Sequence, residues 1–248
     1  MSSATRATER APIAWRVAEV RDVVRETADA VTLELDVPGW PGHRAGQHVD
    51  IRLTAEDGYQ AQRSYSIASA PESAGVALTV ERLPDGEVSP YLVEELRAGD
   101  PLELRGPIGG WFTWEASQGG PLLLLAGGSG LVPLMAMLRH RRLTGSDVPA
   151  QLLLSVRGAG DVLYADELAT LGDLVTITYT RAAPPGWTGP TGRLDRDALG
   201  RLAFGADARP RVFVCGPTGF VEAAASILVE LGHDPARIKT ERFGASGT

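Results

Sequence analysis

Two short segments of this 248-residue chain carry residue types that suit redox cofactors. The first, Arg63–Ser69, reads RSYSIAS, and a strand there would present an arginine, an aromatic ring and hydroxyls at alternating positions. Arginine binds phosphate in bidentate fashion, an aromatic ring stacks on a flat heterocycle, and a hydroxyl hydrogen-bonds a ring nitrogen. This combination suits a flavin, although an ordinary barrel strand with a surface arginine fits the same pattern.

The second segment is Leu122–Pro133, where the apolar run LLLLA leads through GGSG into a helix-like stretch. A glycine-rich turn between a buried strand and a helix lets a pyrophosphate approach the N–H groups of the helix start. The spacing matches neither G-x-G-x-x-G nor the phosphate loop, and Pro133 stands where the third glycine would be. Alone, the segment is a strand–turn–helix junction that favours a phosphate ligand.

Two further segments would complete such sites. In Gly86–Pro90, Ser89 is the predicted N-cap and Pro90 the predicted first residue of a helix whose free amides would receive a phosphate. An ordinary capped helix is the alternative. In Val214–Gly219, Cys215 stands where a strand meets the expected cleft. No histidine lies nearby in sequence to activate its thiol, so a contact with the nicotinamide is expected rather than nucleophilic attack.

The remaining candidates are arginines at strand ends, which could bind a phosphate, and four histidines. Thr180 and Arg181 start a loop at the end of one strand, and Arg157 ends the preceding strand, so these residues would bind an adenosine 2′-phosphate; solvent-facing loop arginines are the alternative. Arg193 is a weaker candidate. The four histidines show no metal-ligand spacing, so no metal site is expected and they are interpreted as surface or structural residues: His43, His48, His140 and His233.

The run RHRR at residues 139–142 is expected to close a helix. Cations at a helix C-terminus interact favourably with the macrodipole. The alternative is that this run docks an acidic electron-carrier protein.

The elements that would position these groups change character along the chain. Apolar alternation and turn residues in the first half predict a six-stranded antiparallel β-barrel, interrupted by one helix at Ser89–Arg97. Continuous apolar runs alternating with helical patterns in the second half predict a doubly wound parallel α/β domain. The predicted strands are Ala14–Arg25, Ala30–Val37, Gln47–Thr54, Arg63–Ser69, Val76–Arg82 and Leu102–Arg105, then Leu122–Ala126, Gln151–Val156, Leu174–Thr180, Val212–Cys215 and Ile238–Phe243. The predicted helices of the second half are Leu131–Leu143, Tyr164–Leu171, Asp195–Ala203 and Phe220–Leu231.

Composition bounds the function. A net charge of −7 without a long Lys/Arg cluster argues against nucleic acid as a partner. Cys215 is the single cysteine, which excludes an intrachain disulfide and an iron–sulfur cluster held by this chain alone. No apolar run is long enough to span a membrane, and the first dozen residues lack the apolar core of a secretory signal. We therefore expect a cytoplasmic protein. We also expect a monomer, and the motifs divide it into a disordered tail at 1–12, a flavin-binding barrel at 13–116 and an NAD(P)-binding domain at 117–248.

Taken together, the motifs resemble those of the ferredoxin–NADP reductase superfamily, from about Trp15 to Gly244. Four appear in family order: R-x-Y-S-x-x-S at Arg63, G-x-V-S at Gly86, G-G-S-G-x-x-P at Gly127 and C-G-P at Cys215. The terminal E-R-F-G at residues 241–244 is similar to the family's E-x-F ending, although four residues follow it here.

The resemblance implies a role for each matching residue. Ser66, Cys215 and Glu241 would lie at the reacting rings. Thr180 and Arg181 would favour NADPH over NADH. The residues and the resemblance together predict these cofactor-binding residues: Arg63, Ser64, Tyr65, Ser66, Gly86, Val88 and Ser89 for flavin; Gly128, Ser129, Gly130, Arg157, Thr180, Arg181, Cys215, Gly216 and Pro217 for the dinucleotide; and Phe243 at the flavin edge.

The resemblance also implies an activity. We expect an FAD-dependent NAD(P)H oxidoreductase, without a fused ferredoxin domain, that passes electrons to a separate acceptor such as a ferredoxin serving an oxygenase. FMN in place of FAD stays open, as does a reductase of free flavin or quinone. A non-catalytic flavin-binding subunit is a further alternative, as is an unrelated protein with a barrel and an α/β domain.

Overall fold

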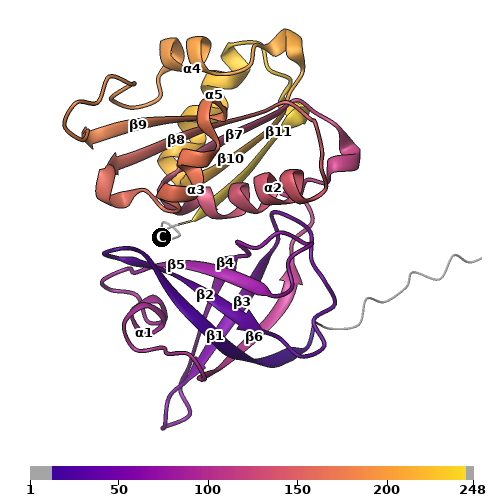
Figure 1. Ribbon diagram of the computed structural model, residues 1–248, viewed down its shortest axis with the longest axis vertical. Coiled ribbons are helices and arrows are strands. Elements are labelled where there is room, and N and C mark those ends of the chain that lie inside the picture. The colour runs from indigo at the N-terminus through magenta and orange to yellow at the C-terminus, as the bar shows by residue number, and fades with distance from the viewer. Residues whose placement is uncertain (1–12, 244–248) are drawn as a thin grey trace, which may run out of the picture.

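The computed structural model describes residues 13–243. The tail expected at residues 1–12 and Gly244 of the terminal motif lie outside the described residues. Two sheets dominate the structure, and Figure 1 shows the antiparallel one below the parallel one. The connection between them covers residues 109–121, and the boundary expected between residues 116 and 117 falls inside it and stays a prediction.

The predicted barrel is confirmed. Its six strands follow the order β4-β3-β6-β1-β2-β5, with every pair antiparallel. The Ile67–Leu78 bridge joins the two edge strands just past the end of β4, and the N–H of Ala68 donates to the Ala77 carbonyl at 2.7 Å. The sheet therefore closes where the RSYSIAS motif lies. The elements are β1 (Trp15–Thr27), β2 (Ala30–Asp36), β3 (His48–Thr54), β4 (Gln60–Ser66), β5 (Val76–Glu81), α1 (Ser89–Glu94) and β6 (Pro101–Ile108).

The second domain is a five-stranded parallel sheet in the order β11-β10-β7-β8-β9. Every residue of β7 is buried, as an all-apolar central strand requires. Leu122 and Leu124 belong to the core that includes α2, whereas Leu123 and Leu125 belong to the core that includes α5. The elements are β7 (Leu122–Gly127), α2 (Leu131–Leu143), β8 (Ala150–Gly158), α3 (Ala165–Thr170), β9 (Val175–Ala182), α4 (Arg196–Leu202), β10 (Arg211–Pro217), α5 (Thr218–Glu230) and β11 (Ile238–Phe243).

The two domains share one apolar core. Helices α2 and α3 lie on the face of the parallel sheet that is turned toward the barrel, and α4 and α5 lie on the far face (Figure 1). The core around α2 continues into Ala45, Ala68 and Trp114 from the barrel and its connection. Burial of such side chains contributes about 25 cal/mol per Å² of apolar surface. Within residues 13–243, no helix is long and apolar enough to cross a membrane.

Helix α1 differs from its sequence prediction. It begins at Ser89 itself, its N-cap is Val88, and no side chain caps it. The Ser89 hydroxyl instead accepts the N–H of Leu83 at 3.0 Å, so it closes the loop before the helix. A Cβ added to Gly86 would lie 2.8 Å from that hydroxyl, which is why glycine fits there. The tertiary hydrogen bond to Leu83 replaces the predicted local cap.

Gly46 gives a test of the contact between the domains. Its φ is +97°, and an added Cβ would lie 2.0 Å from the Phe112 carbonyl oxygen and 2.8 Å from Met137 Cε of α2. Because both strain and collision oppose a side chain, Gly46→Ala should lower the free energy of unfolding by about 2 kcal/mol or more. Urea unfolding measures this. Gly160→Ala, where an added Cβ meets open space, should stay within about 0.5 kcal/mol of the parent, and equal losses would contradict the assignment.

Candidate active site

Three adjacent parallel strands end at the same edge of the sheet, and each is followed by or ends in a predicted motif. Strand β7 leads into Gly128–Gly130, β10 ends in Cys215–Pro217, and β11 contains Glu241 and Phe243. The register pairs Cys215 with Ala126 on one side and with Glu241 on the other. The carboxyl ends of strands are where ligands bind in open α/β sheets. The structure thus brings the dinucleotide motifs and the terminal motif together.

The glycines of this edge are shaped for a ligand's close approach. Gly128 has a φ of +55°, and an added Cβ there would meet open space. At Gly130 an added Cβ would lie 2.2 Å from the Cys215 carbonyl oxygen, so only glycine lets the turn lie against β10. Helix α2 starts directly after this turn, and no side chain caps its start. These features fit a pyrophosphate.

The RSYSIAS motif runs along β4 and past its end. Tyr65 is half-buried, and burial raises the pKa of its phenol to about 12, so the ring is neutral. Arg63 is exposed, and its Nη2 lies 2.5 Å from Glu87 Oε2, an anionic oxygen of the kind a phosphate presents. The Ser64 hydroxyl donates to Asp50 Oδ1 at 2.6 Å. The predicted strand over Arg63–Ser69 therefore ends at Ser66, because the chain turns there to close the barrel.

A carboxylate and an imidazole link the two domains beside Ser66. Ser66 pairs with His48 on β3, and His48 Nδ1 lies 3.9 Å from Glu241 Oε1. Burial raises the pKa of Glu241 to about 7, and burial also lowers the pKa of His48. The other oxygen, Glu241 Oε2, is buried and makes no hydrogen bond within residues 13–243. A buried unpartnered oxygen is costly unless a ligand or a proton satisfies it, which fits a polar cofactor edge at this point.

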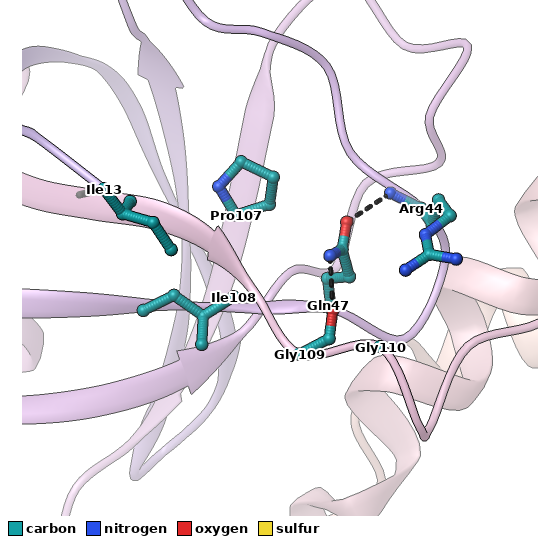
Figure 2. Close-up of a pocket in the computed structure, with 7 residues that line it drawn as sticks. All are labelled: Ile13, Arg44, Gln47, Pro107, Ile108, Gly109 and Gly110. Carbon is teal, nitrogen blue, oxygen red and sulfur yellow. Dashed lines mark hydrogen bonds between the residues drawn. The ribbon is translucent and has the colours of Figure 1, made fainter. Parts of the chain in front are cut away.

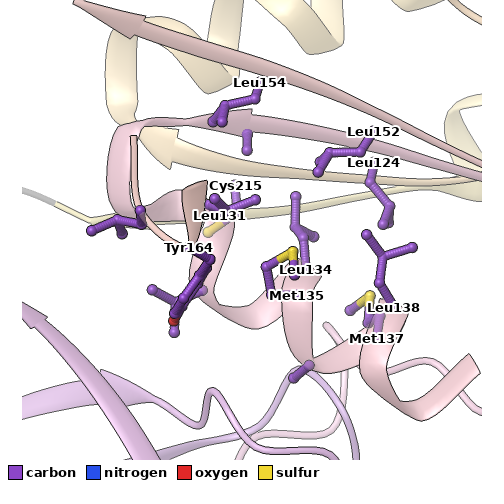
Figure 3. Close-up of a cluster of buried hydrophobic side chains, with 14 of the residues drawn as sticks. Leu124, Leu131, Leu134, Met135, Met137, Leu138, Leu152, Leu154, Tyr164 and Cys215 are labelled. Carbon is purple, nitrogen blue, oxygen red and sulfur yellow. The ribbon is translucent and has the colours of Figure 1, made fainter. Parts of the chain in front are cut away.

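Cys215 lies at the centre of this edge as a buried thiol. Figure 3 shows it beside Leu131 at the start of α2. Burial raises its pKa well above the usual value, and the Glu241 carboxylate adds to the shift. A thiol held protonated is a poor nucleophile. Packing and ligand contact are therefore the roles its surroundings permit.

The outer rim carries the residues predicted to bind a 2′-phosphate. A register shift between the Val156–Tyr179 and Gly158–Ala182 pairs places Arg157 across from Thr180 and Arg181. Both arginines are exposed. The Thr180 hydroxyl donates to the Val156 carbonyl at 3.1 Å, so it fixes the two strands at this point.

The histidines were only partly predictable. All four were expected at the surface or in structural roles, which agrees with the buried His140 and His233, but His48 lies at the site. The only sequence signal for His48 is its place in the strand predicted over Gln47–Thr54, and the structure pairs it with Ser66. The run at 139–142 was expected to serve the helix end, yet Arg139 and His140 contact the barrel. The reason is that the face of helix α2 that carries Arg139 and His140 lies against the barrel.

A pocket of about 810 Å³ opens at the end of β6, on the barrel side of the contact between His48 and Glu241. Figure 2 shows Gln47 bridging its wall, accepting the N–H of Arg44 at 2.7 Å and donating to the Gly109 carbonyl at 2.6 Å. A Cβ at Gly109 would lie 3.4 Å from His48 Nδ1, so the pocket borders the site. None of the residues predicted to bind FAD lines it.

Comparison with known proteins agrees with this geometry. Residues 17–113 match the family model of the oxidoreductase FAD-binding domain, and residues 124–226 match that of the oxidoreductase NAD-binding domain. The chain is 33% identical over 236 residues to the glycine betaine monooxygenase reductase subunit of Chromohalobacter salexigens, covering 90% of this chain and 63% of that protein. It is 34% identical over 254 residues to an NADPH oxidoreductase of Mycobacterium tuberculosis, covering 94% of this chain and 62% of that protein.

Among solved structures, the FAD/NAD-binding domain of nitric oxide dioxygenase from Vibrio cholerae superposes with a TM-score of 0.82 at 26% identity, covering 92% of this chain and 98% of that one. The chain spans less than two thirds of the length of both curated relatives described above. The paired domain matches, their order and the fold are those that the motifs predicted. The chain belongs to the ferredoxin–NADP reductase superfamily, with an oxidoreductase FAD-binding domain followed by an oxidoreductase NAD-binding domain.

Proposed function

We propose that this chain is a flavin-dependent NAD(P)H oxidoreductase that binds FAD on its barrel and NAD(P)H on its parallel sheet. The observation that carries the proposal is the contact of His48 with Glu241, because it brings the end of the flavin strand against the carboxyl ends of β10 and β11. Bound FAD would accept a hydride from the nicotinamide and release electrons singly.

The chain's own residues would bind and orient the two ligands. Arg63 would exchange Glu87 for a phosphate, Tyr65 would stack on the ring system, and Ser66 would hydrogen-bond its edge. The turn after β7 would hold the dinucleotide pyrophosphate at the start of α2. Near neutral pH, Glu241 would hold a proton at its unpartnered Oε2 beside the reacting rings. Of the remaining predicted residues, Gly86, Val88 and Ser89 would border the flavin phosphates, Gly216 and Pro217 the nicotinamide, and Phe243 the flavin edge.

The electron acceptor would be a separate protein of the ferredoxin class serving an oxygenase. The chain's relatives include proteins named as a monooxygenase reductase subunit and as a dioxygenase electron transfer component. The single cysteine of these 248 residues cannot by itself hold an iron–sulfur cluster, so such a carrier lies outside them.

An anaerobic absorbance titration tests the function. The protein loaded with FAD should show flavin absorbance that bleaches on addition of NADPH or NADH, with NADPH faster. Flavin that stays oxidised with both donors would refute the oxidoreductase activity and support the alternative of a non-catalytic flavin-binding protein. Failure to take up FAD or FMN would refute the flavin site itself.

Arg181 should discriminate between the two nucleotides. Its guanidinium is exposed at the rim and would bind only the 2′-phosphate of NADPH. Arg181→Ala should weaken NADPH binding roughly 10- to 100-fold and leave NADH binding within about twofold of the parent, as loss of a charge-assisted hydrogen bond implies. Steady-state kinetics with both donors measure this, with the exposed Arg201→Ala as the control. Equal losses for both donors would refute the assignment.

Glu241 should give the stability of the protein a pH dependence. Its folded-state pKa of about 7 lies above the ordinary 4.5, so the folded protein holds this proton more tightly than the unfolded chain. The stabilisation that this tighter proton binding gives the folded state is complete below pH 4.5 and is lost as the pH rises through 7. Relative to Glu241→Gln, the parent should lose on the order of 2 kcal/mol in unfolding free energy between pH 5 and 8, after allowance for partial exposure.

Urea unfolding at the two pH values measures this difference. Glu56→Gln, an exposed carboxyl in a turn, serves as the control and should follow the parent. Parallel curves for the parent and Glu241→Gln would contradict the buried, raised carboxyl.

A further inference from the structure

Arg139 of α2 connects three elements from two domains. Its Nη1 donates to the Ala68 carbonyl of the barrel at 2.7 Å. Its Nε and Nη2 bind both carboxylate oxygens of Glu167 on α3, at 3.1 and 2.5 Å. The side chain is only 18% exposed. A buried guanidinium is stable only with such pairing, so its position is fixed by the groups around it.

Tyr164, on which this guanidinium stacks, is itself fixed to the barrel. The Arg139 Cζ lies 4.5 Å from the centroid of the Tyr164 ring, a cation–π distance. The Tyr164 hydroxyl hydrogen-bonds Thr79 Oγ1 of β5 at 2.5 Å. The backbone N–H of Tyr164 donates to Glu26 Oε2 of β1 at 3.1 Å. Thr32 joins these two partners, at 2.8 Å from the Thr79 hydroxyl and 2.6 Å from Glu26 Oε1. Figure 3 shows Tyr164 pointing from the α/β domain toward the barrel strands.

The backbone at Tyr164 supports the same conclusion. Its φ of +55° is rare for a residue with a bulky side chain. Such a conformation persists only where the surrounding contacts determine it. The closed ring of hydrogen bonds through Glu26, Thr32 and Thr79 supplies those contacts.

The place where Arg139 binds matters for the chemistry. Ala68 follows Ser66 by two residues, about 7 Å along the chain. Along α2, Arg139 follows Leu131 by eight residues, about 12 Å from the turn that would hold the pyrophosphate. One hydrogen bond therefore fixes the strand that would carry the flavin relative to the helix that would carry the dinucleotide.

We propose that Arg139 is a positioning residue for hydride transfer, because its contacts with Ala68, Glu167 and Tyr164 set the distance between the two bound rings. This inference rests on the proposed function. Hydride donor and acceptor must lie about 3–3.5 Å apart, and an error of about 1 Å costs roughly 100-fold in rate. Arg139 touches neither proposed ligand, so its effect must appear in the rate at saturation rather than in nucleotide affinity.

Other contacts keep the domains docked without Arg139, which makes the test possible. His140 Nδ1 lies 2.8 Å from Glu72 Oε1 of the barrel, and its Nε2 accepts the N–H of Ala116 at 3.1 Å. The shared apolar core around Trp114 also spans the contact. A variant at Arg139 should therefore fold with the domains together but less well aligned.

The test compares Arg139→Met and Arg139→Lys with Arg142→Met in the FAD-loaded protein. Arg142, on the same helix, is 61% exposed, and its contact with Glu167 is a weak one, at 3.9 Å between Nη2 and Oε1. Arg139→Met should retain FAD and keep the NADPH concentration for half-saturation within about threefold, while anaerobic flavin reduction at saturation falls at least tenfold. Arg139→Lys should recover only part of that rate, since one ammonium cannot bridge Ala68 and Glu167 as a planar guanidinium does. Arg142→Met should match the parent.

Hydrogen exchange gives a readout that does not depend on turnover. In Arg139→Met, the Ala68 amide, which donates to Ala77, should exchange at least tenfold faster, with the centre of the parallel sheet unchanged. Unchanged exchange and rate would overturn the proposal, as would a rate loss that follows nucleotide affinity or loss of FAD. If the parent itself is not reduced by NADPH, the proposed function fails, and the positioning role for hydride transfer fails with it. The exchange result then reports only whether Arg139 holds the two domains together.

Discussion

The contact between helix α2 and the barrel is the constraint on which the rest of the structure depends. Each domain can complete its own sheet, but the proposed chemistry needs two flat rings to meet between the domains. Helix α2 starts at the GGSG turn and ends against the barrel, so it belongs to both sites. The shared apolar core resists separation of the domains, and the polar contacts of Arg139, His140 and Tyr164 specify one alignment among the many that apolar packing would tolerate.

The same contact explains the electrostatics at the strand ends. Closing the two domains removes water from Glu241 and His48, and each responds by favouring its neutral form. The chain thus has a carboxyl that titrates near neutrality without any acidic neighbour to raise its pKa. Burial alone is enough, because Glu241 is half-buried in β11 and pairs with the fully buried Cys215 of β10.

Local pattern was enough to predict most of the fold. The bounds of Leu131–Leu143 and Ile238–Phe243 were predicted to the residue, because apolar periodicity and flanking turns are sequence-local signals. The end of β4 at Ser66 and the hydrogen bond made by the Ser89 hydroxyl were not, because a barrel closure and a contact with Leu83 decide them. The motif residues could be placed by resemblance. The positions of His48 and Arg139 could not, since each acts across the domain boundary on a partner far away in the sequence.

The lone sulfur of the chain has a consequence of its own. Thiolates rather than thiols are the nucleophiles that react with peroxide and similar oxidants. Cys215 lies where electrons would pass, yet its burial beside Glu241 keeps the thiol protonated. Burial first, and the Glu241 carboxylate second, thus make this side chain less reactive toward such oxidants. The chain could therefore keep a reduced cysteine beside a bound flavin.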